Sequence, residues 1–190
     1  MKKALFIFFV SALYGVCQGS EKVFVENFDR ARRFSRHWTT DAASGSGRIE
    51  RLPDGGIDDS GCVRITSSER TSLAVKCQLT GLEQGRLYRV SARLKCEDVR
   101  DGRGAVLFLD PEGLDQSWNA SEFVYGTSDW REVYMDFVPD TLGEATICCG
   151  LGFPWGTYNG GKASGTVWWD DVRVEPASDE SVYTRESEHI

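Results

Sequence analysis

A strict alternation of apolar and polar residues, with a period of two, is the feature that most constrains the fold. Over residues 87–96 every second side chain is apolar, namely Tyr88, Val90, Ala92, Leu94 and Cys96. The positions between them are polar, namely Arg89, Ser91, Arg93 and Lys95. Successive side chains of a strand point to opposite faces of the sheet. This segment is therefore predicted to be a strand with one face in a core and one in water, as in antiparallel sheets.

Short apolar stretches of this kind recur along most of the chain, cut by Gly, Asp, Asn, Ser or Pro. Strands are predicted over residues 23–28, 48–51, 61–66, 72–79, 86–96, 104–109, 122–125, 131–138, 144–151 and 167–174. No long segment has helical periodicity. One-sided strands without helices predict an all-β fold class, a two-sheet antiparallel β-sandwich or a barrel.

The N-terminal segment has the order of a secretory signal. Two lysines precede an uncharged run over residues 4–16, and small or polar residues follow. That run is shorter than the roughly 20 residues of a transmembrane helix, and no later segment is long or apolar enough to span. We therefore expect a signal peptide at 1–19, a folded domain at 20–175 and a polar, disordered tail at 176–190. The expected location is secreted or periplasmic; the alternative is a lipid anchor on Cys17.

Charge and histidine content exclude several classes of function. The chain has 29 acidic and 22 basic residues, a formal net charge of -7, so it should not bind nucleic-acid phosphates through bulk charge. With only two histidines, a zinc cage or a Ser–His nucleophile is not expected. Five cysteines follow the signal, namely Cys62, Cys77, Cys96, Cys148 and Cys149. A disulfide among them is possible but cannot be assigned from sequence.

Several landmarks occur together in a specific order. They are the segment 26–29 followed by Trp38, then 61–65, 82–91, 127–133 and 165–174. In this order and spacing the chain resembles carbohydrate-binding modules of the cellulase-C (CenC) type, within the galactose-binding-like jelly rolls. The resemblance covers residues 23–175 and implies a jelly-roll sandwich that binds a polysaccharide or oligosaccharide. It also implies that Trp38, Trp130 and Trp168 pack in the core.

Aromatic residues in polar loops are the candidate sugar contacts. A ring covers the apolar face of a pyranose while nearby polar groups satisfy the hydroxyls. The Gly-rich loop 150–161 contains Trp155, Tyr158 and Asn159, and a second loop contains Trp118. Tyr134 alternates onto the polar face of its strand. For each ring the alternative is packing rather than ligand contact.

Three acidic residues are candidate calcium ligands. Glu26 lies near the start of the domain and Asp170 and Asp171 near its end, on strands that the resemblance places side by side. In this fold such carboxylates commonly hold a structural calcium, which takes roughly six to eight oxygen ligands. Asp170 shares the parity of Val172 and Val174, so it is expected to point inward. The alternative is a set of exposed carboxylates in a turn.

The predicted function is a non-catalytic module that recognises a glycan chain and acts beside separately encoded glycoside hydrolases. One alternative is a secreted structural or protein-interaction sandwich without sugar affinity. Another is a glycoside hydrolase, which needs two carboxylates about 5 to 10 Å apart. The unpatterned acids Asp110, Glu112, Asp115 and Glu122 offer such a pair only by chance.

Overall fold

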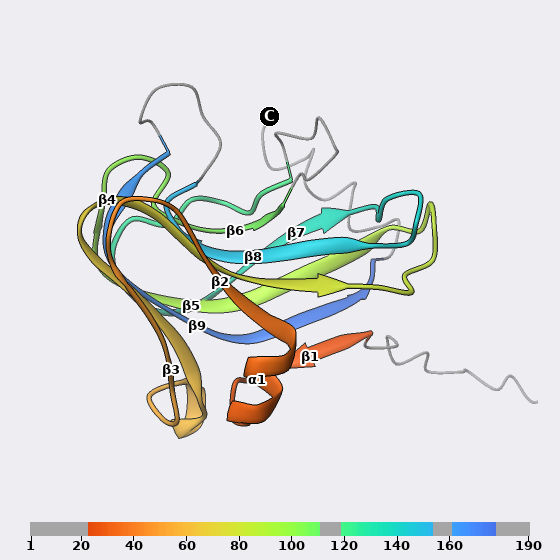
Figure 1. The fold of residues 1–190 in the computed structure, drawn as a ribbon, viewed down its shortest axis with the longest axis horizontal. Helices are drawn as coiled ribbons and strands as arrows, with labels where there is room; N and C mark the ends of the chain where they lie inside the picture. The colour runs from red at the N-terminus through yellow and green to blue at the C-terminus, as the bar shows by residue number, and fades with distance from the viewer. Residues whose placement is uncertain (1–22, 111–118, 154–160, 178–190) are drawn as a thin grey trace, which may run out of the picture.

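A single long strand, β4 (Cys62–Leu79), passes from one sheet of the fold into the other. The computed structural model describes residues 23–110, 119–153 and 161–177, and these form a two-layer antiparallel β-sandwich (Figure 1). The predicted fold class is therefore confirmed. The other elements are β1 (Phe24–Glu26), α1 (Ala31–His37), β2 (Trp38–Ser44), β3 (Arg48–Leu52), η1 (Ile57–Asp59), β5 (Tyr88–Arg100), β6 (Ala105–Leu109), β7 (Gly126–Phe137), β8 (Ala145–Leu151) and β9 (Ala163–Pro176).

The two layers share β4. Sheet A has the order β3-β4-β9-β5-β7, with β1 also paired to β9, and uses residues 62–71 of β4. Sheet B has the order β2-β4-β8-β6 and uses residues 72–79. Figure 1 shows β5 and β9 side by side in one layer and β8 and β6 in the other. A register shift between Ser67 and Thr71 marks where β4 leaves sheet A.

The structure corrects three predictions about individual elements. The predicted strands 61–66 and 72–79 are one strand, because the polar residues between them continue β4 through its bend. Residues 122–125 form no strand of their own; Val124 makes an isolated bridge to Ala105 of β6, and Ala120, before this segment, makes another to Phe108. Neither β2 nor α1 was predicted. The outer residues of β2 are exposed and polar, so its sequence carries no apolar alternation.

The core lies between the sheets and contains the inward face of every long strand. All five alternating apolar residues of β5 are buried in it, as are Val133, Met135 and Phe137 of β7, which confirms both predicted patterns. Of the tryptophans predicted to be core, Trp38 is buried, but Trp130 and Trp168 are only half-buried. Trp169 is fully buried instead. Trp168 faces outward, where it pairs with Lys95 and its ring lies 5.5 Å from the Lys95 ammonium.

The five cysteines within the described residues are all buried and unpaired. Cys148 and Cys149 are neighbours on β8, and alternation sends them to opposite faces of sheet B. Cys149 belongs to the core between the sheets, whereas Cys148 belongs to a second apolar cluster on the outer face of sheet B. A disulfide between these two residues would therefore need the strand to be distorted.

Candidate functional site

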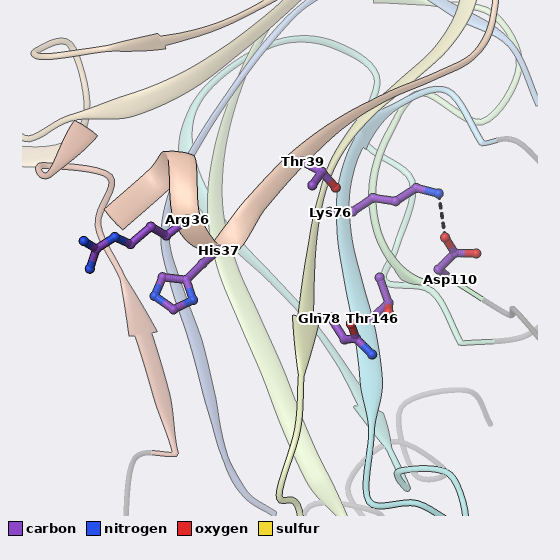
Figure 2. A pocket seen from close by; sticks show the side chains of 7 residues that line it. All are labelled: Arg36, His37, Thr39, Lys76, Gln78, Asp110 and Thr146. Carbon is purple, nitrogen blue, oxygen red and sulfur yellow. Dashed lines mark hydrogen bonds and ion pairs between the residues drawn. The ribbon is translucent and has the colours of Figure 1, made fainter. Parts of the chain in front are cut away.

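The outer face of sheet B holds a groove of about 420 Å³. Figure 2 shows its side chains, which come from the end of α1 and from strands far apart in sequence. The lining residues are Arg36, His37, Thr39, Lys76, Gln78, Asp110 and Thr146. Every one of these side chains can donate or accept hydrogen bonds.

Strand alternation positions the floor of this groove. In the second half of β4, Val75, Cys77 and Leu79 enter the core, so Lys76 and Gln78 must point outward. Strand pairing then places side chains of β2 and β8 beside those of β4. Thr39 of β2 lies opposite Lys76, and Thr146 of β8 lies opposite Gln78. The floor is thus a cross-strand row of polar side chains from β2, β4 and β8.

Lys76 is the electrostatic centre of the groove. Its ammonium lies 2.5 Å from a carboxylate oxygen of Asp41 and 2.5 Å from one of Asp110. Burial works against the charge on Lys76, but the hydrogen bonds to Asp110 and Asp41 raise its pKa above the ordinary value. Both carboxylates are thereby held in place. The groove consequently presents fixed donors and acceptors rather than mobile charges.

The opposite end of the same outer face is apolar. Phe108 is buried against Phe153, with ring centroids 5.0 Å apart, and both belong to a cluster with Ala74, Val106 and Cys148. A Cβ on Gly150 would lie 2.9 Å from the Phe108 ring, so glycine leaves room for this ring to approach β8. Sheet B therefore has an outer face that changes from apolar to polar along its strands.

Four of the five predicted sugar contacts lie outside the described residues: Trp118, Trp155, Tyr158 and Asn159. The described residues next to these segments can nevertheless be placed on the sandwich. Asp110 lines the groove and leads into residues 111–118, and the N–H of Leu109 donates to the Asn119 carbonyl at 3.0 Å. Phe153 leads into 154–160, and its N–H donates to the Gly161 carbonyl at 2.8 Å. The described residues that flank both segments therefore lie on the sheet B side of the sandwich.

Tyr134 lies on the opposite side of the molecule, on the outer face of sheet A. It is 40% exposed, and the Arg89 guanidinium lies 4.2 Å from its ring centroid. Arg89 in turn makes a bidentate pair with Asp136, at 2.8 and 2.9 Å, which raises the pKa of Arg89. Arg93 faces Glu132 at 4.0 Å. This face is a surface of paired charges around one tyrosine, and it does not adjoin the groove.

Glu26 and Asp170 are both almost fully buried, and β1 pairs with β9 as the resemblance implies. Asp170, however, does not point inward with Val172. Asp171 has a left-handed φ of 50° and forms a bulge, which shifts the alternation by one residue. Trp169 therefore enters the core, and Asp170 lies on the other side of the sheet beneath residues 56–60.

The described contacts give the two carboxylates separate partners. Glu26 accepts from the Phe28 N–H at 2.9 Å and pairs with Arg33 at 3.2 Å. Asp170 accepts from the Ile57 N–H at 2.9 Å and the Ser60 hydroxyl at 2.7 Å. Burial raises the pKa of Asp170, against the effect of these hydrogen bonds.

Asp171 is bound by Arg173, at 2.8 and 2.5 Å. Backbone N–H, hydroxyl or arginine groups thus contact all three predicted calcium ligands, although Oε2 of Glu26, 3.2 Å from Arg33, accepts no hydrogen bond within the described residues. The described arrangement therefore does not fit a shared calcium site, and calcium stays a prediction that requires these contacts to rearrange. Across residues 23–110, 119–153 and 161–177, no group of three or more His, Cys, Asp or Glu residues is placed to hold a metal.

Within those same ranges, no helix has the length and apolar character needed to cross a membrane.

Sequence reasoning missed most of the groove. Lys76, Gln78, Thr39 and Thr146 are ordinary polar residues at outward positions of strands, and nothing local distinguishes them from solvent-facing residues. Asp110 was considered only as a chance carboxylate. One signal was available: four arginines and a histidine fall within residues 30–37 of an acidic chain.

Comparison with known proteins shows the fold. No protein-family model matches the chain. No curated protein matches it either. Among solved structures, the CBM22-2 xylan-binding domain from Paenibacillus barcinonensis Xyn10C matches with a TM-score of 0.54 at 14% identity, over 81% of this chain and 99% of that one. The CBM22-1 xylan-binding domain of the same protein matches with a TM-score of 0.51 at 11% identity, over 84% of this chain and 97% of that one.

A third similar structure belongs to a much longer chain. The enzymatically active domain of tailspike protein 4 from bacteriophage CBA120 matches with a TM-score of 0.52 at 11% identity, over 74% of this chain but only 19% of that one. At these identities the similarity concerns the fold alone. The chain accordingly has the jelly-roll sandwich of carbohydrate-binding modules.

Proposed function

We propose that this protein is a non-catalytic carbohydrate-binding module whose binding surface is the outer face of sheet B. The observation that carries the proposal is the polar groove across β2, β4 and β8. Its side chains are hydrogen-bonding groups held by strand pairing, and its central cation is neutralised by fixed carboxylates. A chain of sugar hydroxyls needs such donors and acceptors in fixed positions, because pre-ordered groups lose little entropy on binding.

The fold comparisons support the same assignment. Two of the similar structures are xylan-binding domains, and this chain covers nearly the whole of each. Since one fold hosts many functions, the groove rather than the fold carries the proposal. The finer cellulase-C type, secretion and action beside glycoside hydrolases belong to the proposal as predictions.

Aromatic platforms complete the proposed site. Trp118 belongs to the segment that begins beside the groove at Asp110, and Trp155 and Tyr158 to the segment that begins at Phe153 on the same face. We propose that these rings, with Asn159, contact the sugar. Tyr134 is a separate candidate on sheet A. Its ring already has Arg89 over it, so a sugar would have to displace that guanidinium.

The contacts of the carboxylates around the groove argue against glycoside hydrolysis. Asp41 and Asp110 both contact the groove lysine Lys76. A third carboxylate, Glu144, accepts a hydrogen bond from the groove residue Gln78 at 3.0 Å. A glycosidase needs one acid free to protonate the leaving group and another free to attack or activate water. The Lys76 pairs would have to break before Asp41 or Asp110 could act.

Affinity electrophoresis in gels containing soluble xylans, β-glucans or galactans tests this function. We expect the protein to be retarded by at least one polymer without release of reducing sugar. Thr39→Ala/Gln78→Ala removes two groove side chains that are exposed and make no core contact. Each lost hydrogen bond is worth about 0.5–1.5 kcal/mol, so the double variant should bind roughly tenfold more weakly.

A matched control separates binding from general damage. Thr127→Ala/Gln84→Ala changes the same residue types outside the groove and should bind like the wild type. Tyr134→Ala decides between the two faces: unchanged binding assigns the site to sheet B, and lost binding assigns it to sheet A. Absence of retardation in every gel would favour a structural or protein-interaction role, and release of reducing sugar would favour an enzyme.

A further inference from the structure

A cluster of cations at α1 is unexpected in a chain with a net charge of -7. We call it the α1 cluster. It consists of Arg30, Arg32, Arg33, Arg36 and His37. All five side chains are exposed, and they surround a shallow cavity of about 270 Å³. Figure 2 shows Arg36 and His37 at the edge of the groove.

The charges of the α1 cluster are not neutralised in the described parts of the chain. Elsewhere on the sandwich, exposed or half-buried arginines such as Arg89, Arg131 and Arg173 pair with carboxylates. In the α1 cluster, only Arg33 does so, with Glu26. Among the described residues, no carboxylate lies within ion-pair distance of the other four members. Positive charge is therefore available to a ligand at this place.

This clustering opposes helix formation. Arg32 and Arg36 are four residues apart, so they lie on one face of the helix, where like charges destabilise it by a few tenths of a kcal/mol. α1 has only seven residues, no side-chain hydrogen bond at its N-cap and no acid in its first turn. Packing of Phe34 against Phe28, at 5.9 Å between ring centroids, holds it in place. A bound anion would relieve the repulsion.

The α1 cluster and the groove form one continuous surface. Arg36 and His37 line both cavities, and Thr39 follows two residues later on the groove floor. A ligand lying across the groove would therefore reach the arginines at one end. Its sugar rings would meet uncharged and ion-paired groups, and only its end near α1 would meet unpaired cations.

We infer that the groove binds a glycan bearing carboxylate groups, with the α1 cluster contacting those carboxylates. The inference rests on the proposed function and names its substrate class: a polysaccharide with uronic acid residues or side groups. Guanidinium groups match a carboxylate in a bidentate, planar geometry. A nucleic acid fits less well, because the cations occupy one short helix and the rest of the chain is acidic.

The test compares two polymers that differ only in charge, glucuronoxylan and the same glucuronoxylan after chemical reduction of its carboxyl groups. The whole protein should bind the charged polymer at least about fivefold more tightly at about 20 mM salt. The preference should disappear at about 500 mM salt, where charges are screened within a few ångströms. This salt series needs no variant.

Arg32→Gln/Arg36→Gln should abolish the preference, so that the variant binds the charged and the reduced polymer equally tightly. Glutamine keeps a high helix propensity, and circular dichroism and thermal melting verify that the variant is folded. The control is Arg70→Gln/Arg93→Gln, which removes the same charge. Both of its arginines are exposed and face a carboxylate at 4.0 Å. It should keep the preference.

The outcomes separate the inference from the proposed function. Equal affinity for both polymers, or a preference that survives in Arg32→Gln/Arg36→Gln, overturns the inference and leaves the carbohydrate-binding function standing. Binding to neither polymer, nor to any neutral glycan, overturns both. Equally tight binding of dextran sulfate or duplex DNA would show a general polyanion surface, and would overturn the assignment to a carboxylated glycan.

Discussion

Lys76→Met is the substitution that most directly tests how the groove is held together. Methionine has a similar length and no charge, so it removes the ammonium and keeps most of the packing. It leaves Asp41 and Asp110 without their shared cation. The Asp110 side chain is only 6% exposed, whereas that of Asp41 is 33% exposed. The main cost should therefore come from Asp110.

The expected loss of stability follows from that burial. Removing one partner of a fully buried ion pair costs about 3–5 kcal/mol, because the remaining charge is uncompensated. The Lys76 side chain is 20% exposed, so water compensates part of the loss. We expect about 2–3 kcal/mol, which for a domain of this size lowers Tm by roughly 4–12 °C.

Urea unfolding followed by tryptophan fluorescence measures this loss. Lys76→Met/Asp110→Asn removes the stranded charge as well, and it should recover at least half of the lost stability. A loss below about 0.5 kcal/mol for Lys76→Met would refute the reasoning, because it would mean that water already solvates these charges. Equal losses for the single and double variants would show that the aliphatic stem of Lys76, rather than its charge, matters.

Three further predictions concern the core, the thiols and calcium. Trp169→Ala should cost about 3–5 kcal/mol in urea unfolding and the adjacent Trp168→Ala clearly less, since only Trp169 is fully buried; equal costs would contradict this placement. Burial raises the pKa of Cys62 and of Cys96 to about 11 and that of Cys77 to about 12. These thiols should contribute their full share to the free energy of unfolding below pH 9, the ordinary thiol pKa, and that share should fall as pH rises toward 12, because the thiols of the unfolded chain ionise first. Iodoacetamide should label these thiols at pH 8 only after unfolding. Added calcium tests the predicted site: a rise in Tm that Asp170→Ala abolishes would show that these contacts rearrange around the ion, and no calcium effect in the wild type would remove the site.

The strand faces were predictable from sequence because they depend on a local rule. Alternation in residues 88–96 and 132–137 places each side chain inside or outside without knowledge of the partner strand. The same rule failed at Asp170, where one bulged residue, Asp171, shifted the alternation. A left-handed φ at an aspartate is compatible with many sequences, so the residue types alone gave no sign of it.

The sequence by itself determined the all-β class, the one-sided strands and most of the core, since these follow from the burial of every second apolar residue. Only the tertiary structure decided that β4 spans both sheets and that the groove joins β2, β4 and β8. It also decided that the α1 cluster, whose arginines lie on and just before α1, adjoins that groove. The physical reason is that a binding surface consists of outward side chains from strands distant in sequence. Their proximity depends on strand pairing and register, which the local pattern of each strand does not contain.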